Sequence, residues 1–347
     1  MADHGFFAPD SVSRRVWSYP TSLTVGFARA VTIEHLDPLL AASVIATGQV
    51  KQRTPLRYDR TMQYFATVLF GDAASVIKSS EVLMKIHKRS VGTDEVTGTT
   101  YDANDPDSQL WIHLTAWHSI LYTYEMFGPG KLSPEDEAQY WQECVVAAEF
   151  QTIDTERMPR TREDVVAYFD AFRPKMVMSD GAQDMFRFLV NMHRSSLPDD
   201  VPGWIRNPVN ALMSRAVVAT MPRWMREMGG TPQSRVTDAA VVAALKPILR
   251  AVHRVPRWEL WILKKMSPRT HPILAPYFRG VEPVQNKVWD VDEARETFGS
   301  GKAPRELYEE QLEARAAGAG AESYQKNHHD PLLRFDTAGE AGGTLVR

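Results

Sequence analysis

Three histidines, His87, His113 and His118, lie within residues 85–120 and are the first candidates for chemistry in this chain. A neutral imidazole can bind a metal or move a proton, and it can equally be a hydrogen-bonded core residue. His113 and His118 share one predicted helix, where their spacing makes the two side chains diverge by roughly 140°. They cannot easily bind one ion together, so the three histidines are expected to have separate roles.

The predicted helix over residues 72–91 places His87 on its inner face. An unsatisfied buried imidazole costs roughly 1–3 kcal/mol. His87 is therefore expected to be a hydrogen-bonded structural residue or a ligand, with Leu83 and Met84 beside it in the core. The stripe that faces water consists of Lys78, Glu81, Lys85 and Lys88, and the opposite stripe consists of Val76, Ser80, Leu83, Met84, His87 and Val91.

The preceding helical pattern, over residues 57–70, adds cations to the same region. Arg57 and Thr61 share its inner stripe with Tyr64 and Phe65, and Arg60 lies beside that stripe. Arginines at the inner start of an apolar helix are costly unless they meet an anion or a carboxylate. A structural salt bridge would explain them. A heme would also explain them, because its propionates need cationic partners, its iron takes a neutral imidazole and its flat apolar body needs a lined pocket.

The elements that must position these residues are almost all helical. Asp105 and Pro106, Ser133 and Pro134, and Thr161 have the spacing of helix starts, and Gly71 with Asp72 separates two helices. The best strand signal, around residues 95–103, predicts a short hairpin after Gly92. Further helical patterns cover residues 29–47, 180–194, 208–227 and 236–265. The expected fold class is all-α.

Composition sets the limits of function. The chain has 347 residues, 44% hydrophobic and 24% charged, which is typical of a soluble globular protein. Its net charge of -3 gives no electrostatic case for binding nucleic acid. A single cysteine, Cys144, cannot form an internal disulfide, and no apolar run has the length of a signal peptide or an integral membrane segment. The expected location is cytoplasmic, and a homo-oligomer is compatible with these features.

Three regions are expected along the chain: an irregular N-terminal arm over residues 1–27, a cofactor-binding domain over 28–285 and a C-terminal helical or flexible extension over 286–347 that adds little to the core. The sequence contains no HExxH, no pair of CxxC motifs, no GxGxxG after a strand and no P-loop. Mononuclear zinc and nucleotide sites therefore have little support.

The chain resembles the oxygenase family of latex clearing protein (bacterial rubber oxygenase) and the MpaB-type oxygenase of mycophenolic acid synthesis. The resemblance runs in order through "RYDRT", "FGD", "KIHKRSVG", "GTTYDANDPDSQLWIHLTAWHSILYTYE" and "LSPEDEAQYWQE", and it covers roughly residues 28–280. It implies an all-α fold similar to the globins and, as in the rubber oxygenases, heme b as the cofactor. Those enzymes use dioxygen to cleave isoprenoid carbon–carbon double bonds.

By position, the resemblance makes His87 the proximal ligand of the heme iron. It places Arg57 and Thr61 in the cofactor pocket, His113 in a supporting role and Arg60 on the distal side as the catalytic candidate. Leu83 and Met84, which flank His87 on its stripe, are expected to contact the cofactor. His118 is expected to be an ordinary helix residue. The sequence departs from rubber oxygenase where Met84 and Val91 replace two arginines around the ligand histidine and where no carboxylate follows Asp37 in the matching helix.

Two function classes follow from the resemblance, and a third from the residues alone. The first is a heme-dependent oxygenase that acts with dioxygen on a small apolar substrate, isoprenoid or lipid-like. The second is a heme-binding sensor or carrier without oxygenase turnover, which the missing carboxylate favours. The third is a helical interaction module without a cofactor, which requires the face of His87 to be ordinary core.

Overall fold

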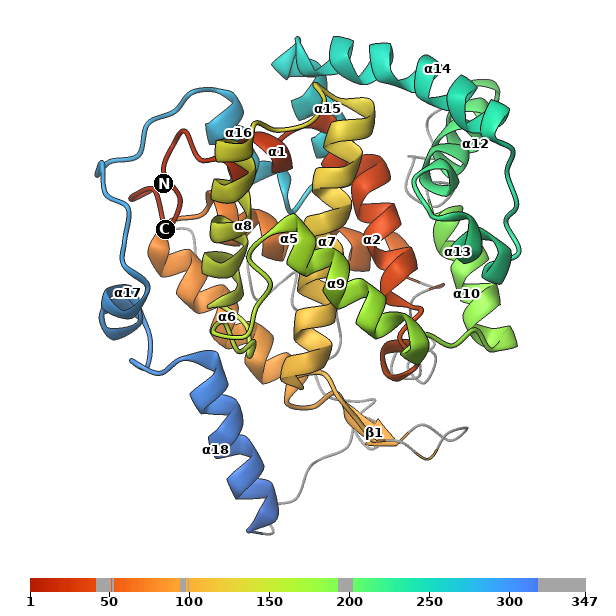
Figure 1. Ribbon diagram of the computed structural model, residues 1–347. Coiled ribbons are helices and arrows are strands. Elements are labelled where there is room, and N and C mark those ends of the chain that lie inside the picture. Colours follow the sequence, from red (N-terminus) through yellow and green to blue (C-terminus); the bar gives the residue numbers. More distant parts are fainter. Residues whose placement is uncertain (42–50, 52, 94–97, 99, 193–201, 318–347) are drawn as a thin grey trace.

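The computed structural model describes residues 1–41, 51, 53–93, 98, 100–192 and 202–317, and helices dominate it (Figure 1). Helix accounts for 69% of the structure and strand for 2%, so the predicted all-α class is confirmed. The globin-like arrangement around a heme stays a prediction. Within the described part of the chain, no helix is both long enough and apolar enough to cross a membrane.

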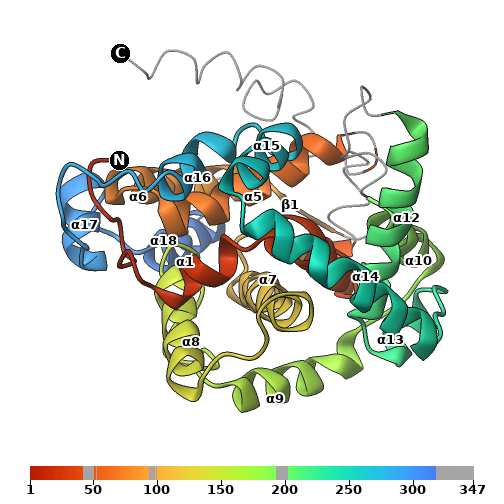
Figure 2. The ribbon, with the colours of Figure 1, turned by 90° about the horizontal axis from the view of Figure 1, so that it is seen from above.

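Helix α7 (Pro106–Phe127) runs through the middle of the molecule, and other helices surround it (Figure 2). As the sequence predicts, Asp105 caps its first turn by accepting a hydrogen bond from the backbone N–H of Ser108 at 2.9 Å. Trp111 and Trp117 are fully buried on different sides of the helix. A helix that is buried nearly all round needs no face of charged residues. Packed against α7 are α1 (Val12–Trp17), the π-helix η1 (Ser22–Gly26), α2 (Phe27–Glu34), α8 (Pro134–Ala148) and α14 (Arg235–His253).

Residues 1–27 belong to the core, so the predicted irregular arm is wrong. Helix α1 is capped by the Ser11 hydroxyl, and Trp17 stacks on Phe65 with ring centroids 5.1 Å apart. Buried apolar surface holds this segment in place. One short helix and one π-helical turn are too brief to show a clear periodicity in the sequence, which is why the pattern missed them.

Helices α5 (Thr54–Phe70) and α6 (Ala73–His87) carry most of the predicted site residues. The predicted boundary between them is confirmed, because Gly71 ends α5 and the Asp72 carboxylate accepts from the Ser75 N–H at 3.0 Å. The predicted hairpin is also confirmed. Its strands β1 (Val91–Thr93) and β2 (Thr100–Asp102) are antiparallel, and residues 94–97 and 99 at its tip lie outside the described residues.

Proline divides two of the predicted helices. The pattern over residues 236–265 forms α14 and α15 (Pro256–Met266), because Pro256 has no N–H to continue the first helix. The pattern over 208–227 forms α12 (Gly203–Ala219) and α13 (Arg223–Met228), which are separated at Pro222. The helix predicted over residues 29–47 is interrupted, because α2 ends at Glu34. Residues 42–47 of that prediction lie outside the described part.

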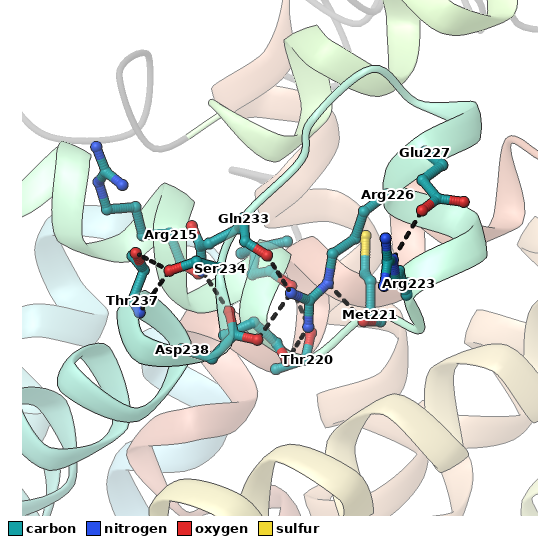
Figure 3. A network of polar contacts seen from close by, with 12 residues as sticks. Arg215, Thr220, Met221, Arg223, Arg226, Glu227, Gln233, Ser234, Thr237 and Asp238 are labelled. Atoms are coloured by element: carbon teal, nitrogen blue, oxygen red, sulfur yellow. Dashed lines mark hydrogen bonds and ion pairs between the residues drawn. The ribbon is translucent and has the colours of Figure 1, made fainter.

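A half-buried ionic network fixes the start of α14 (Figure 3). The Arg226 guanidinium donates to the Met221 carbonyl at 2.7 Å and to the Ala219 carbonyl at 2.9 Å, both at the end of α12 and its following turn. It also pairs with the Asp238 carboxylate at 2.8 Å, and Gln233 donates to the other Asp238 oxygen at 2.7 Å. Helices α12, α13 and α14 are therefore connected by charge-assisted bonds as well as by packing.

The C-terminal extension contributes to the core in its described part, contrary to the expectation for residues after 285. Helices α17 (Val291–Phe298) and α18 (Pro304–Ala316) pack on α6, and Ala294 is fully buried. Arg295 bonds to the Glu149 carbonyl at 2.7 Å and to its carboxylate at 2.9 Å. Residues 318–347 lie outside the described part. The remaining elements are α9 (Arg162–Phe172), η2 (Arg173–Lys175), α10 (Asp180–Val190) and α16 (His271–Phe278).

Candidate functional site

His87 is the last residue of α6 and faces the start of α7. Its Nδ1 lies 2.9 Å from the side-chain nitrogen of Gln109, which also donates to the Ala103 carbonyl. Burial is the main cause that lowers the pKa of His87 to about 4. The Arg57 charge also lowers this pKa, whereas the Asp102 charge and hydrogen bonds to Asn104 and Ala103 raise it. The ring is therefore neutral at pH 7, the state in which an imidazole binds a metal.

The contact of His87 with Gln109 is at Nδ1. An amide nitrogen only donates, so Nδ1 accepts from Gln109 and the neutral ring carries its proton on Nε2. The Asn104 amide donates to the Met84 carbonyl at 3.2 Å and so ties the end of α6 to the loop before α7. His87 is thus held at Nδ1 by an amide donor from the first turns of α7.

His35, which sequence reasoning missed, is a second imidazole of this kind. It follows the end of α2 and is 7% exposed. Its Nδ1 donates to the Val31 carbonyl at 2.6 Å, so Nε2 carries the lone pair. Among the described residues this buried Nε2 has no hydrogen-bond partner. Burial lowers the pKa of His35 to about 4, with a further lowering by the Arg57 charge.

Arg57 connects the two histidines electrostatically. Its charge lowers the pKa of both His35 and His87, so its guanidinium lies close to both rings. Arg57 and Arg60 on α5 are half-buried, each with a polar interaction of its own, and Thr61 is exposed. The positive charge of Arg57 therefore acts on the imidazoles at the ends of both α2 and α6.

The acid next to Arg60 has another role. Asp59 is buried, and its carboxylate accepts from the backbone N–H of Arg269 at 2.9 Å and of Thr270 at 3.2 Å. The Thr270 hydroxyl also donates to it at 2.9 Å. Asp59 thus fixes the loop between α15 and α16 to α5.

His113 lies fully buried between α7 and α8, with both ring nitrogens engaged. Its Nε2 donates to the Cys144 carbonyl at 2.9 Å, and its Nδ1 accepts from the Gln151 amide at 3.1 Å. Burial lowers its pKa to about 4. His113 therefore has no free nitrogen for a metal, which agrees with a supporting position. His118 instead has its Nδ1 3.3 Å from the Arg29 guanidinium, on a different side of α7.

The two predicted neighbours of His87 lie on the same stretch of α6. Leu83 is half-buried and Met84 is buried. Met84 lines a small hollow that includes Phe150 and two residues of the C-terminal helices, Pro304 and Leu307.

Glu34 is a further titratable group that the sequence did not single out. It is buried next to His35 in the chain, and burial raises the pKa of its carboxyl to about 8. Among the described residues it forms no ion pair, so it is protonated at pH 7. Among the same residues, no group of three or more His, Cys, Asp or Glu side chains is arranged to hold a metal ion.

Comparison with protein families places these residues in a known domain. Residues 14–258 match the family model of the ER-bound oxygenase mpaB/B'/Rubber oxygenase, catalytic domain. The chain belongs to this oxygenase family. The match includes His35, Arg57, His87 and His113, begins inside α1 and ends inside α15. Comparison with curated proteins and comparison with solved structures each gave no match. Membership of a catalytic oxygenase domain supports an enzyme with oxygenase activity.

Proposed function

We propose that the protein is a heme b-dependent oxygenase or related oxidoreductase that acts with dioxygen on a small apolar substrate, isoprenoid or lipid-like. Family membership supports the oxygenase class. The observation that carries the cofactor is the neutral imidazole of His87, held on its Nδ1 side, with the Arg57 charge beside it. A histidine that ligates a metal donates its other ring N–H to an acceptor, and Gln109 would fill that role at Nδ1 once its amide turned its oxygen toward the ring.

The residues fit a heme in three respects. His87 would ligate the iron through Nε2, with the ring proton moved to Nδ1 on the side of Gln109. Arg57 would pair with a propionate, and Arg60, three residues on, would lie toward the distal side. A bound heme would supply the redox chemistry with dioxygen. The chain's own part is to keep two imidazoles neutral, to hold a cation beside them and to bury the apolar body between helices.

Arg60 differs from a lysine in a way that matters for this chemistry. A guanidinium keeps its proton at any pH that proteins tolerate and is a very poor iron ligand. Arg60 would therefore leave the sixth coordination position open and act as a hydrogen-bond donor to developing negative charge. The substrate is expected to be apolar because family membership points to it, and its identity is a matter for a screen.

Absorbance of the freshly purified protein tests the cofactor, and dioxygen uptake tests turnover. A Soret band together with a pyridine hemochromogen spectrum of the b type is the expected result. Dioxygen consumption with a panel of terpenoids and unsaturated fatty acids should then exceed consumption by the His87→Ala variant. A colourless protein that takes up no added hemin would remove the proposal.

The structure also favours a specific alternative, a heme-binding sensor or carrier. The enclosed Nε2 of His35 is a second available imidazole near Arg57. If both histidines bound the iron, no position would remain for dioxygen. A six-coordinate spectrum that resists carbon monoxide would select the carrier, and ready binding of carbon monoxide by the ferrous protein would select the oxygenase.

A further inference from the structure

Helix α15 presents two tryptophans to solvent. Trp258 is 54% exposed and Trp261 is 59% exposed, although large aromatic side chains are usually buried. At about 100° per residue, the exposed tryptophan and cationic side chains of α15 fall within an arc of roughly 120°. The opposite side of the helix packs on the protein through buried residues. The exposed set is Arg257, Trp258, Trp261, Lys264 and Lys265, and the buried set is Glu259, Leu263 and Met266.

The same part of the chain is strongly basic. Residues 246–265 contain six lysines and arginines and one acid, whereas the whole chain has 40 basic and 43 acidic residues. That acid, Glu259, is buried and bonds to His253 at 3.0 Å, so it does not neutralise the outer face. Among the described residues, no carboxylate pairs with four of these cations, which are Lys246, Arg254, Arg257 and Lys264.

We propose that the exposed face of α15 docks the protein on the surface of an anionic lipid bilayer. Tryptophan is the side chain that prefers the boundary between headgroups and acyl chains, and lysine and arginine extend from that depth toward phosphates. A short helix that combines these residues on one side lies along a membrane without crossing it. This interaction is distinct from the proposed heme chemistry and does not depend on it.

Charge argues against a second copy of the chain as the occupant. A two-fold symmetric dimer would bring the same face of each copy together. That arrangement would oppose the cations of one α15 to those of the other, which is destabilising. An anionic bilayer has the complementary charge, and each lysine or arginine near such a surface strengthens binding roughly fivefold.

The docking face is rigidly attached to the helix that carries Arg57 and Arg60. The loop after α15 is held by the Asp59 carboxylate of α5 through Arg269 and Thr270. Figure 2 shows α14, α15 and α16 together on the side nearest the viewer, with α5 next to α15 and α16. Docking through α15 would therefore bring the proposed site close to the bilayer, where an apolar substrate would be dissolved.

Sedimentation with lipid vesicles tests the proposal on the full-length protein. Vesicles of phosphatidylcholine alone are compared with vesicles that also contain phosphatidylserine. Binding is expected only with phosphatidylserine present, and raised salt should weaken it. The Arg257→Gln/Lys264→Gln double variant should bind about 30-fold more weakly, since two cations of this face are neutralised. The matched control, Arg157→Gln/Arg160→Gln, removes two exposed charges elsewhere and should bind like the native protein.

A second pair of variants tests the tryptophans. The Trp258→Ala/Trp261→Ala variant should lose roughly tenfold or more in vesicle affinity, because it removes the apolar surface that would be buried in the bilayer. Trp204→Ala is the control, because it removes a tryptophan of α12 that is 79% exposed, and it should bind like the native protein. Circular dichroism confirms that each variant is folded. Equal binding to both kinds of vesicle, or no binding to either, would overturn the proposal. So would a dimer in light scattering that the Trp258/Trp261 variant converts to monomer, because that result assigns the face to self-association.

Discussion

Acidification of the heme-free protein from roughly pH 7.5 to pH 5 lowers its free energy of unfolding. This loss should be about 2 kcal/mol smaller in the His35→Gln variant than in the native protein. Burial lowers the pKa of His35 from 6.5 to about 4. At pH 5 the unfolded chain therefore binds a proton at this residue and the folded protein does not. The interval from the unfolded pKa of 6.5 down to pH 5 is about 1.5 pH units. Each unit corresponds to 1.36 kcal/mol, which gives the figure of about 2 kcal/mol.

The sign follows from which state holds the proton. The stability contributed by the neutral imidazole is fully present above the unfolded pKa of 6.5 and is lost as the pH falls toward about 4. Glutamine does not titrate, so the His35→Gln variant lacks this loss. His271→Gln is the control, because burial lowers the pKa of the half-buried His271 by less. The other buried histidines titrate identically in all three proteins and cancel in the comparison.

Urea unfolding at the two pH values, followed by tryptophan fluorescence, measures the free energies. The quantity of interest is the change in unfolding free energy between the two pH values for each protein. If native protein and His35→Gln lose the same free energy on acidification, then His35 accepts a proton in the folded state. The imidazole would then not be enclosed, and the case for a second available ligand nitrogen would fail.

Three further predictions concern the proposed heme site. His87→Ala should purify with little heme while His118→Ala, whose ring contacts Arg29, retains it; equal heme content in both would contradict the ligand assignment. Arg57→Ala should lower hemin affinity in a titration, by a few-fold to tens of fold for one lost charge-assisted bond, whereas Lys78→Ala on the exposed side of α6 should not. Arg60→Leu should keep its heme content but consume dioxygen more slowly, and an unchanged rate at equal heme content would remove Arg60 from the distal side.

Local signals in the sequence predicted helix boundaries well. Asp72, Asp105, Ser133 and Thr161 each cap the helix that the sequence assigned to them, because a short polar side chain before a helix satisfies backbone N–H groups that have no other partner. The inward position of His87 also followed from a local pattern, the alternation of charged and apolar residues along α6. Interactions within one turn of helix are encoded by neighbouring residues, so a single sequence suffices to predict them.

The partners of the site residues were not predictable in this way. The contact between His87 and Gln109 joins residues 22 apart in the chain, and the bond of Asp59 to Thr270 joins residues 211 apart. His35 was missed because the helical pattern was extended to residue 47, which treats His35 as mid-helix. His35 is a candidate ligand only because α2 ends at Glu34 and because its Nε2 has no hydrogen-bond partner among the described residues. Neither feature can be predicted from the neighbouring residues in the sequence.

Two buried polar groups at the end of α2, Glu34 and His35, are both held in their uncharged forms. Burial keeps Glu34 protonated and His35 neutral, because it disfavours the charged form of each group. An exposed glutamate would be negative at neutral pH, and an exposed histidine would be positive at low pH. A protein that needed only stability would gain by replacing an enclosed nitrogen without a partner with an apolar group. The lone pair of His35 therefore has a cost in the heme-free protein. A ligand that binds this nitrogen would remove that cost, and in the sensor or carrier alternative that ligand would be the heme iron.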